Sequence, residues 1–382
     1  MARAAHAEPD VAETSAPASP PPSLSLLPAP QVHAFVSQGF IKGTKNNFLV
    51  DSKRGSFEFT DVGINFTEPL TDRLRTGVQL FASQLGKAGD FTARMDWFYL
   101  DYRFADWLGL RVGRTKIPFG LYNEINDIDS ARVPVLLPQS VYPILNRDIL
   151  LAQTGAELYG YFELGRGGGL EYRLYGGTLF VSPPAAPAGA TLADFQVPYL
   201  FGGRLMWDAP LEGLRLGGNV QALRFNTTFD IPRTGMPTLV LEEDLPFLLW
   251  LASAEYSHRD LLLAAEYGRW RADVEITGAP TYRVVNERYY AMAAYRFTRW
   301  FVPGVYYASL VTDIHKPMTI DNYRRDWAAT LRFDINPNWL VKLEGHFMNG
   351  TDELDPALNG GLPPAMLAKN WLLFLAKTTA YF

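Results

Sequence analysis

Apolar and polar residues alternate along most of this chain from Gln31 onward. The clearest segment is Phe91–Phe104, whose two sets of alternate positions hold Phe98, Leu100, Tyr102 and Phe104, and Trp97, Tyr99, Asp101 and Arg103. Because successive side chains of a β-strand point to opposite faces, this alternation predicts strands with one apolar and one charged face. A soluble sandwich would bury the apolar face, whereas a barrel in lipid would turn it outward and keep the charged face inside.

Segments of this kind recur along the chain and are joined alternately by short turns and long loops. They predict an all-β fold, a transmembrane antiparallel β-barrel of about 16 strands, with roughly 14 or 18 as alternatives. The predicted strands are Val32–Lys42, Ser56–Thr67, Arg73–Leu85, Phe91–Phe104, Leu108–Arg114, Thr154–Leu164, Leu170–Val181, Pro198–Trp207, Leu214–Phe225, Leu248–Tyr256, Leu261–Trp270, Glu287–Phe297, Phe301–Leu310, Asn322–Phe333, Trp339–Met348 and Asn370–Phe382. Residues 182–197, 226–247 and 271–286 are predicted loops. An unpaired amide is costly in hydrocarbon, so the last strand has to pair with the first.

The last strand carries a second signal. Counting back from Phe382, alternate positions hold apolar or small residues, namely Ala380, Thr378, Ala376, Phe374 and Leu372. This ending resembles the C-terminal strand of Gram-negative outer-membrane β-barrels. The resemblance implies an outer-membrane location, and it implies that Phe382 forms part of the signal read by the barrel-assembly machinery. The alternative is an ordinary buried strand that ends the chain.

Composition agrees with a barrel and narrows the choice of function. Only 48% of the residues are hydrophobic and no apolar run reaches about 18 residues, so we expect no membrane-spanning helix. Aromatic residues make up 14% of the chain, and seven tryptophans near predicted strand ends suggest interfacial girdles: Trp97, Trp107, Trp207, Trp270, Trp300, Trp339 and Trp371. There is no cysteine, and the net charge of −5 argues against nucleic acid as a partner.

The first 30 residues differ from the rest. Residues 8–30 are rich in Ala, Ser and Pro, which predicts a disordered lead-in to a barrel spanning residues 31–382. Ala5-His6-Ala7 has the small-x-small form of a signal-peptide cleavage site. The segment before the barrel is therefore either the remnant of a signal peptide or a short native tail.

Charged residues fall repeatedly on the predicted inner face. The predicted wall residues are Asp101, Arg103, Glu171, Arg173, Arg204, Arg288, Arg296, Arg324, Arg332 and Lys342, and Glu255, Glu266 and Glu344 share the same face. Unpaired charges in a closed apolar core would be very costly, whereas charges that line water are not. A barrel of about 16 strands is wide enough to hold water, so this face predicts a channel. The alternative is an interior plugged by interlocking ion pairs.

The longest irregular stretch follows the fifth predicted strand and begins with Gly113-Arg114-Thr115-Lys116-Ile117-Pro118-Phe119-Gly120. This run, with its position, resembles porins related to the phosphate-selective porin O and P family, over residues 31–382. The resemblance implies that the third external loop folds into the barrel and narrows the pore at Arg114, Lys116, Glu124, Asp127, Asp129, Arg132, Arg147 and Asp148. Cations and acids are mixed there, so we expect diffusion of small hydrophilic solutes or ions with at most a weak anion preference.

Three other functions are rivals to a porin. A barrel enzyme would need a catalytic set, but His6, His33, His258, His315 and His346 lack an accompanying catalytic or metal-binding motif, so no enzyme activity, metal or cofactor is predicted. A plugged adhesive barrel and a soluble secreted β-protein are the other rivals. For a porin, the expected partners are outer-membrane lipid and lipopolysaccharide, the assembly machinery, small solutes and two further copies in a homotrimer.

Overall fold

The computed structural model describes residues 30–86, 89–233 and 236–382. The predicted disordered lead-in at residues 1–30, apart from Pro30, lies outside the described residues. Among the residues described, no helix is both long and apolar enough to cross a membrane.

Within the described residues, sixteen β-strands form one closed antiparallel barrel, as predicted. The strands are β1 (Gln31–Gly43), β2 (Thr60–Pro69), β3 (Leu74–Gln84), β4 (Arg94–Ala105), β5 (Leu108–Lys116), β6 (Ala152–Glu163), β7 (Gly169–Thr178), β8 (Thr191–Asp208), β9 (Leu214–Arg233), β10 (Met236–His258), β11 (Leu261–Ile276), β12 (Tyr282–Tyr295), β13 (Phe301–Val311), β14 (Tyr323–Asn336), β15 (Trp339–Gly350) and β16 (Asn370–Tyr381). The one α-helix among the described residues is α1 (Arg147–Leu150), and short 3-10 helices span Ser52–Arg54, Asn123–Ile125, Asp129–Ala131, Ile144–Asn146, Gly165–Gly167, Ala357–Asn359 and Pro364–Met366.

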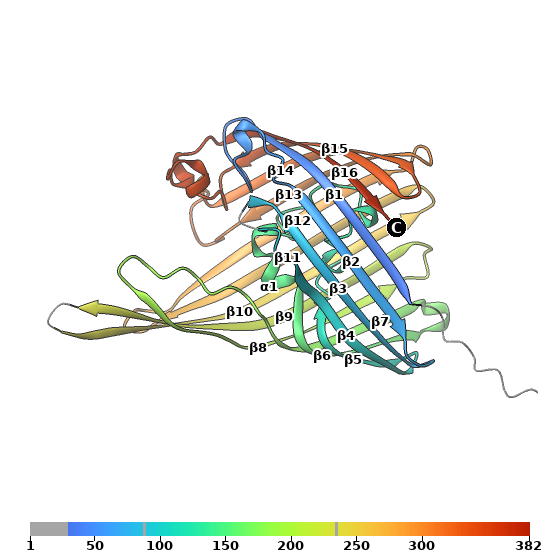
Figure 1. Ribbon diagram of the computed structural model, residues 1–382, viewed down its shortest axis with the longest axis horizontal. Helices are drawn as coiled ribbons and strands as arrows, with labels where there is room; N and C mark the ends of the chain where they lie inside the picture. Colours follow the sequence, from blue (N-terminus) through green and yellow to red (C-terminus); the bar gives the residue numbers. More distant parts are fainter. Residues whose placement is uncertain (1–29, 87–88, 234–235) are drawn as a thin grey trace, which may run out of the picture.

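Each strand pairs with its neighbours in the sequence, and the ring closes between β1 and β16. Nine residue pairs join these two strands, from Phe35 opposite Tyr381 to Gly43 opposite Leu373. Closure gives hydrogen-bond partners to the edge N–H and C=O groups of β1 and β16, which an open sheet would leave unpaired. Short turns and both ends of the barrel sequence lie at one rim, which we call the turn end. The longer connections lie at the other rim, the loop end (Figure 1).

The apolar face of the strands points away from the barrel axis, as the alternation predicts. On β4, Leu100 is 53% exposed, whereas its neighbour Asp101 is 3% exposed. On β16, Leu372 and Phe374 are exposed, and Leu373 between them is buried. Exposed apolar side chains suit contact with lipid, because they bring no charge into hydrocarbon.

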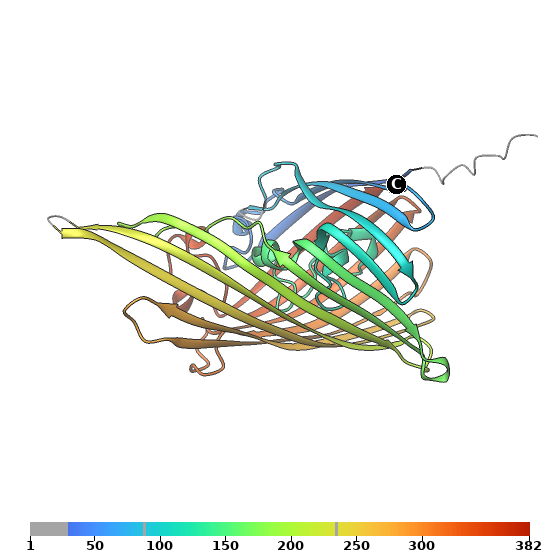
Figure 2. The same cartoon turned by 90° about the horizontal axis from the view of Figure 1, so that it is seen from below.

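Three predicted loops are wrong in part, because β8 to β11 continue beyond the length of the other strands. Residues 226–233 and 236–247 belong to a β9–β10 ladder in which Asn226 pairs with Asp244 and Asp230 with Val240. The extended strands project beyond the loop end on one side of the barrel (Figures 1 and 2). Phe225, Thr227 and Phe229 are buried while the alternate residues are not, so the strand pattern continues where a loop was predicted.

The tryptophan girdle is also partly wrong. Trp107, Trp300 and Trp339 lie beside short turns with 43–56% of their surface exposed, and Trp207 also points outward. In contrast, Trp371 is buried in the barrel interior against Phe48, and its Nε1 donates to the Gly350 carbonyl. Two further tryptophans, Trp97 and Trp270, belong to inner faces. The side of the strand on which a tryptophan falls, and not its closeness to a strand end, decides whether it meets lipid.

Candidate functional site

The β5–β6 segment, residues 117–151, forms contacts with strands all around the barrel. The amide of Gly120 donates to Asn219 on β9, and the amide of Leu121 donates to Glu266 on β11. At another side of the ring, the amide of Val135 donates to Glu344 on β15 at 2.7 Å. A segment bonded to strands on several sides of a closed ring lies within it, and its helical turns lie inside the outline of the barrel in both views (Figures 1 and 2).

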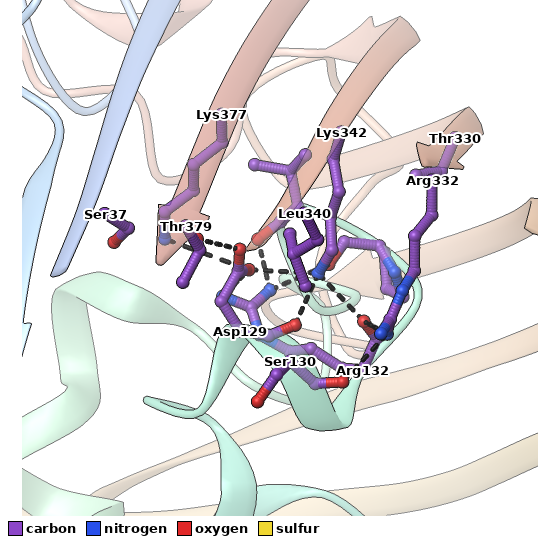
Figure 3. A network of polar contacts seen from close by, with 12 residues as sticks. Ser37, Asp129, Ser130, Arg132, Thr330, Arg332, Leu340, Lys342, Lys377 and Thr379 are labelled. Atoms are coloured by element: carbon purple, nitrogen blue, oxygen red, sulfur yellow. Dashed lines mark hydrogen bonds and ion pairs between the residues drawn. The ribbon is translucent and has the colours of Figure 1, made fainter. Parts of the chain in front are cut away.

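Asp129 fastens this segment to the wall at β15 and β16 (Figure 3). Its carboxylate lies 3.0 Å from the Lys342 ammonium, accepts a hydrogen bond from Thr379 at 2.7 Å, and lies 3.9 Å from the Lys377 ammonium. Burial alone would raise the pKa of Asp129, but Lys342, Lys377 and Arg132 outweigh it and hold that pKa well below its usual range. The carboxylate is therefore ionised and held by cations from two strands.

Lys342 and Arg332 extend the same network to the segment's backbone. The Lys342 ammonium is fully buried and donates to the carbonyls of Asp129, Arg132 and Pro134. Arg332 donates to the carbonyls of Ser130 and Arg132. A buried ammonium is tolerated only where its donors are satisfied, and here backbone carbonyls of the 3-10 helix Asp129–Ala131 and of the residues after it supply the acceptors.

A ladder of alternating charges crosses the inner wall from β3 to β9. Its successive members, one after another, are Arg75, Asp101, Arg111, Glu157, Arg173, Glu124, Arg204, Glu171 and Arg215, with neighbouring charged atoms 2.6–4.0 Å apart. Glu124 is the member that the β5–β6 segment contributes, and it joins Arg173 to Arg204. Burial opposes its ionisation, yet the two guanidinium groups hold the pKa of Glu124 below its ordinary value.

A second ion-pair cluster stands between the β5–β6 segment and the wall at β4 and β5. Asp127 lies 2.9 Å from both Lys116 and Arg147, and Asp96 lies 3.7 Å from Lys116 and 3.1 Å from Arg147. Burial alone would raise the pKa of Asp127, but the charges of Arg147 and Lys116 outweigh burial and hold that pKa well below its ordinary value. Asp96 reaches the interior because the register of β3 and β4 shifts between Gln79 and Leu80, which leaves Asp96 as an extra residue on its strand.

Apolar side chains fill a large share of the interior. One cluster joins Phe119, Tyr142 and neighbouring segment residues to inner positions of β7 to β14, and a second joins Val135 and Leu136 to Trp371 and the β1–β2 connection. Fully burying one large apolar side chain stabilises by about 1.5–3 kcal/mol, so these clusters hold the segment firmly against the wall. The prediction that wall charges line open water is therefore wrong for several of them: Arg204, Arg288, Arg324 and Lys342 are at most 8% exposed.

Open space remains on the side of β1 to β7. A cavity of about 500 Å³ reaches from His33 and Phe382 at the turn end to Lys116 and Asp129. A second, of about 520 Å³, lies at the same rim and shares Arg111 with the first. A third, of about 480 Å³, lies towards the loop end between Asp90, Arg114, Asp148 and Ser182. The Asp96–Lys116 ion pair separates the first cavity from the third, because each cavity is lined by one of the two partners.

The structure brings most of the predicted site residues into these networks. Of the predicted constriction residues, Lys116, Glu124, Asp127, Asp129, Arg132 and Arg147 take part in ion pairs, whereas Arg114 donates to the Asp96 carbonyl and Asp148 lines the third cavity. Of the wall residues, Arg288 and Arg324 pair with Glu353 from the β15–β16 connection. Arg103 and Arg296 lie at the turn end, where they pair with Asp106 and Asp334 and their side chains are about half exposed or more.

Sequence reasoning missed several members of the networks. Arg111 on β5 and Glu157 on β6 occupy inner positions of strands that were correctly predicted, so alternation alone could have found them. Lys377 lies between apolar positions of the last strand, so alternation indicates its face, but its pairing with Asp61 depends on the register of β16 with β1 and β2. Asp96 carries no such signal, because the register shift breaks the alternation at that point.

Comparison with known proteins gives a fold likeness without a sequence relationship. No family model and no curated protein matches this chain. Among solved structures, OmpT of Vibrio cholerae superposes with a TM-score of 0.58 at 11% identity, covering 92% of this chain and 97% of that one. The anion-selective porin from Comamonas acidovorans gives 0.54 at 11% identity over 93% and 99% of the two chains. The outer membrane channel DcaP of Acinetobacter baumannii gives 0.53 at 10% identity over 92% and 97%. This chain therefore has the fold of outer-membrane porins and channels.

Proposed function

We propose that this chain is a porin of the Gram-negative outer membrane that lets small hydrophilic solutes and ions diffuse passively. The turn end would face the periplasm and the loop end the exterior, as in barrels whose turns are short on the periplasmic side. The apolar outer wall, the closed ring and the fold shared with outer-membrane channels support this location. Lipid and lipopolysaccharide would then surround the barrel, and the assembly machinery would insert it.

The observation that carries the proposal is the position of the cavities on either side of one ion-pair cluster. The cavity near the loop end and the cavity that reaches the turn end meet at Asp96, Lys116 and Arg147. A path that follows β1 to β7 would pass this constriction, while the apolar clusters fill the side of β8 to β14. The pore would thus be off-centre, and the β5–β6 segment would act as the constricting third external loop.

Both signs of charge stand at this constriction, which supports at most a weak preference for anions. Lys116 and Arg147 face Asp96 and Asp127, so neither sign is in clear excess. A transverse field of this kind orders dipolar solutes without demanding a net charge. The likeness to a porin described as anion-selective is compatible with this preference, as is the proposed kinship with the phosphate-selective porin O and P family.

The decisive experiment is reconstitution of the full chain into planar bilayers and liposomes. We expect stepwise ion conductance, swelling of liposomes by small neutral solutes, and a reversal potential in a salt gradient that is close to zero or weakly anion-selective. Clear cation selectivity would contradict the charge assignment. A homotrimer is proposed as the assembled state, because a related fold is described in a trimer form, and crosslinking in detergent tests it.

A plugged barrel is the second candidate, and the apolar clusters of the interior favour it. Such a barrel would show heat-modifiable migration on a gel, as a porin does, but no conductance. A barrel enzyme is less well supported. Both ring nitrogens of His346 lie 3.0 Å from carboxylates, those of Asp326 and Glu344, so neither nitrogen is placed to act as a base on a substrate.

A further inference from the structure

Three aromatic rings on the inner wall lie flat over glycines. Each ring stands directly opposite a glycine of the adjacent strand, in the pairs Phe35–Gly63, Tyr99–Gly77 and Tyr159–Gly109. A Cβ atom added at these glycines would come within 2.3–3.0 Å of the facing ring, so the ring occupies the space that a side chain would need. Each ring therefore rests one face on the backbone and turns the other towards the interior.

Trp97 widens this surface beside Tyr99. The two rings are stacked at 17° with centroids 5.4 Å apart, and both lie above Gly77, where an added Cβ would be 2.9 Å from the indole. The Arg111 guanidinium lies over the Tyr99 ring at 5.0 Å. Trp97 and Phe35 are therefore the rings that offer open faces to the 500 Å³ cavity, which both of them line.

Neutral hydrogen-bonding groups stand beside these faces. Asn65 and Thr67 on β2 line the same cavity, and neither side chain has a hydrogen-bond partner in the part of the chain that the structure describes. Gln79 on β3 uses its amide group on Asp96, which leaves its carbonyl oxygen for another donor. The cavity thus offers donors and acceptors towards its turn end, where Asn65 stands opposite His33, and an unpaired polar group there is stable beside water or a polar solute.

The ionic side chains of the cavity are already neutralised. Lys116 pairs with Asp96 and Asp127, and Arg111 pairs with Asp101 and Glu157. The two carboxylates of the lining, Glu124 and Asp129, are paired with arginines and lysines respectively. A solute with a net charge would have to break one of these pairs to find a counter-ion, so the cavity gives it little advantage.

We propose that this cavity, which we call the ring-face site, binds neutral, ring-shaped, polyhydroxylated solutes, that is, small sugars. The apolar C–H face of a pyranose matches the open faces of Trp97 and Phe35, and its hydroxyls match Asn65, Thr67 and Gln79. A volume of about 500 Å³ lies within the roughly 300–1,000 Å³ of small-molecule sites. The inference rests on the proposed porin function and names the class of solute that the pore favours.

The test compares glucose with mannitol in planar bilayers that contain the full chain. The two solutes have similar size and hydroxyl content, but mannitol is acyclic and has no flat face. We expect glucose to reduce the ion current in a saturable manner and mannitol to reduce it only through viscosity. Glucose binding to the detergent-solubilised protein, followed by calorimetry, gives a second readout that does not require conduction.

Two variants locate the effect. Trp97→Ala removes the open ring face and should weaken glucose binding about tenfold, whereas Trp97→Tyr should restore most of it. Trp327→Ala is the matched control, because Trp327 is 60% exposed on the outer wall and should leave glucose binding unchanged.

The outcomes separate the two proposals. Ion conductance with equal effects of glucose and mannitol would overturn the ring-face site and leave the porin intact. Tighter binding of benzoate than of glucose would overturn it as well, because it would show a site for planar anions. Absence of both conductance and liposome swelling would overturn the porin, and calorimetry would then still support or reject the ring-face site.

Discussion

Glu124 carries a negative charge from the β5–β6 segment into the ladder of the inner wall. Arg173 and Arg204 each keep a second carboxylate, Glu157 and Glu171, so the loss of Glu124 would interrupt the ladder without leaving either guanidinium unpaired. Its side chain is 31% exposed, so it also faces water near the proposed path. We therefore expect Glu124 to affect ion selectivity more than the stability of the fold.

We expect Glu124→Gln to shift selectivity towards anions. Removal of one negative charge beside two partly compensated guanidinium groups should raise the ratio of anion to cation permeability about two- to threefold. Reversal potentials in a salt gradient measure this ratio. Glu212→Gln, at an 88% exposed position in a turn, is the control and should not change it. A shift towards cations would contradict the assignment.

Asp129 should make a pH-dependent contribution to stability. Its pKa is lower in the folded barrel than in the unfolded chain, so its contribution is complete above the ordinary carboxyl pKa of about 3.9 and is lost as the pH falls below it. Asp129→Asn leaves buried cations without their carboxylate and should cost about 3–5 kcal/mol at neutral pH. Measuring unfolding by gel mobility at a series of pH values tests this. The free energies of unfolding of the unchanged protein and of Asp129→Asn should converge only in strong acid. Convergence near pH 6 would refute the argument.

At the scale of the element, the β5–β6 segment is held by backbone carbonyls as well as by charges. Lys342→Met removes the donor that reaches Asp129, Arg132 and Pro134, and should loosen the segment. Under the porin proposal we expect a larger and noisier single-channel conductance. Lys316→Met changes a lysine that is 66% exposed in an outer loop and should leave conductance as it is. An unchanged current in Lys342→Met would show that the segment does not depend on this anchor.

The projecting β9–β10 hairpin should be dispensable for the barrel. Its upper part, beyond the Thr227–Glu243 pair, lies past the last residue pair of β10 with β11, and only residues 228–230 of it pair with β8. Replacing residues 228–242 by Asn-Gly provides a two-residue turn in register. We expect unchanged heat-modifiable migration and an unfolding temperature within a few degrees. Loss of folding would show that the projection supports the barrel.

The strands could be predicted because alternation is a local property of the sequence. The contacts in the interior could not be predicted, because they depend on how distant strands pair. The inner position of Asp101 follows from its neighbours on β4, whereas its pairing with Arg75 and Arg111 depends on the register of three strands. Asp96 escapes alternation altogether because of the register shift. Glu124 was named as a site residue, but a loop has no periodicity, so its place between Arg173 and Arg204 could not be derived.

At the scale of the whole molecule, the barrel depends on one pairing between its first and last strands. Deleting residues 370–382 would leave β1 and β15 with open edges. We expect such a chain to aggregate and to lose heat-modifiable migration. Phe382→Ala is the contrasting variant, because the pairing of Phe382 with Ala34 uses only backbone groups. It should refold normally in detergent and, if Phe382 is an assembly signal, accumulate poorly in the outer membrane of cells.

The strand that completes the ring also encloses the segment it touches. Thr379 and Lys377 on β16 contact Asp129 from the wall side, yet residue 129 is synthesised some 250 positions earlier. The barrel closes by pairing β16 with β1, and β16 is the last strand to be synthesised. The topology therefore rules out closure of the barrel before synthesis reaches β16. Residues 117–151 either occupy the interior while the sheet is still an open trough, or enter later through the wide rim. Disulfide trapping between cysteines placed at positions 129 and 379 during refolding would show whether residues 117–151 enter the interior before or after β1 pairs with β16.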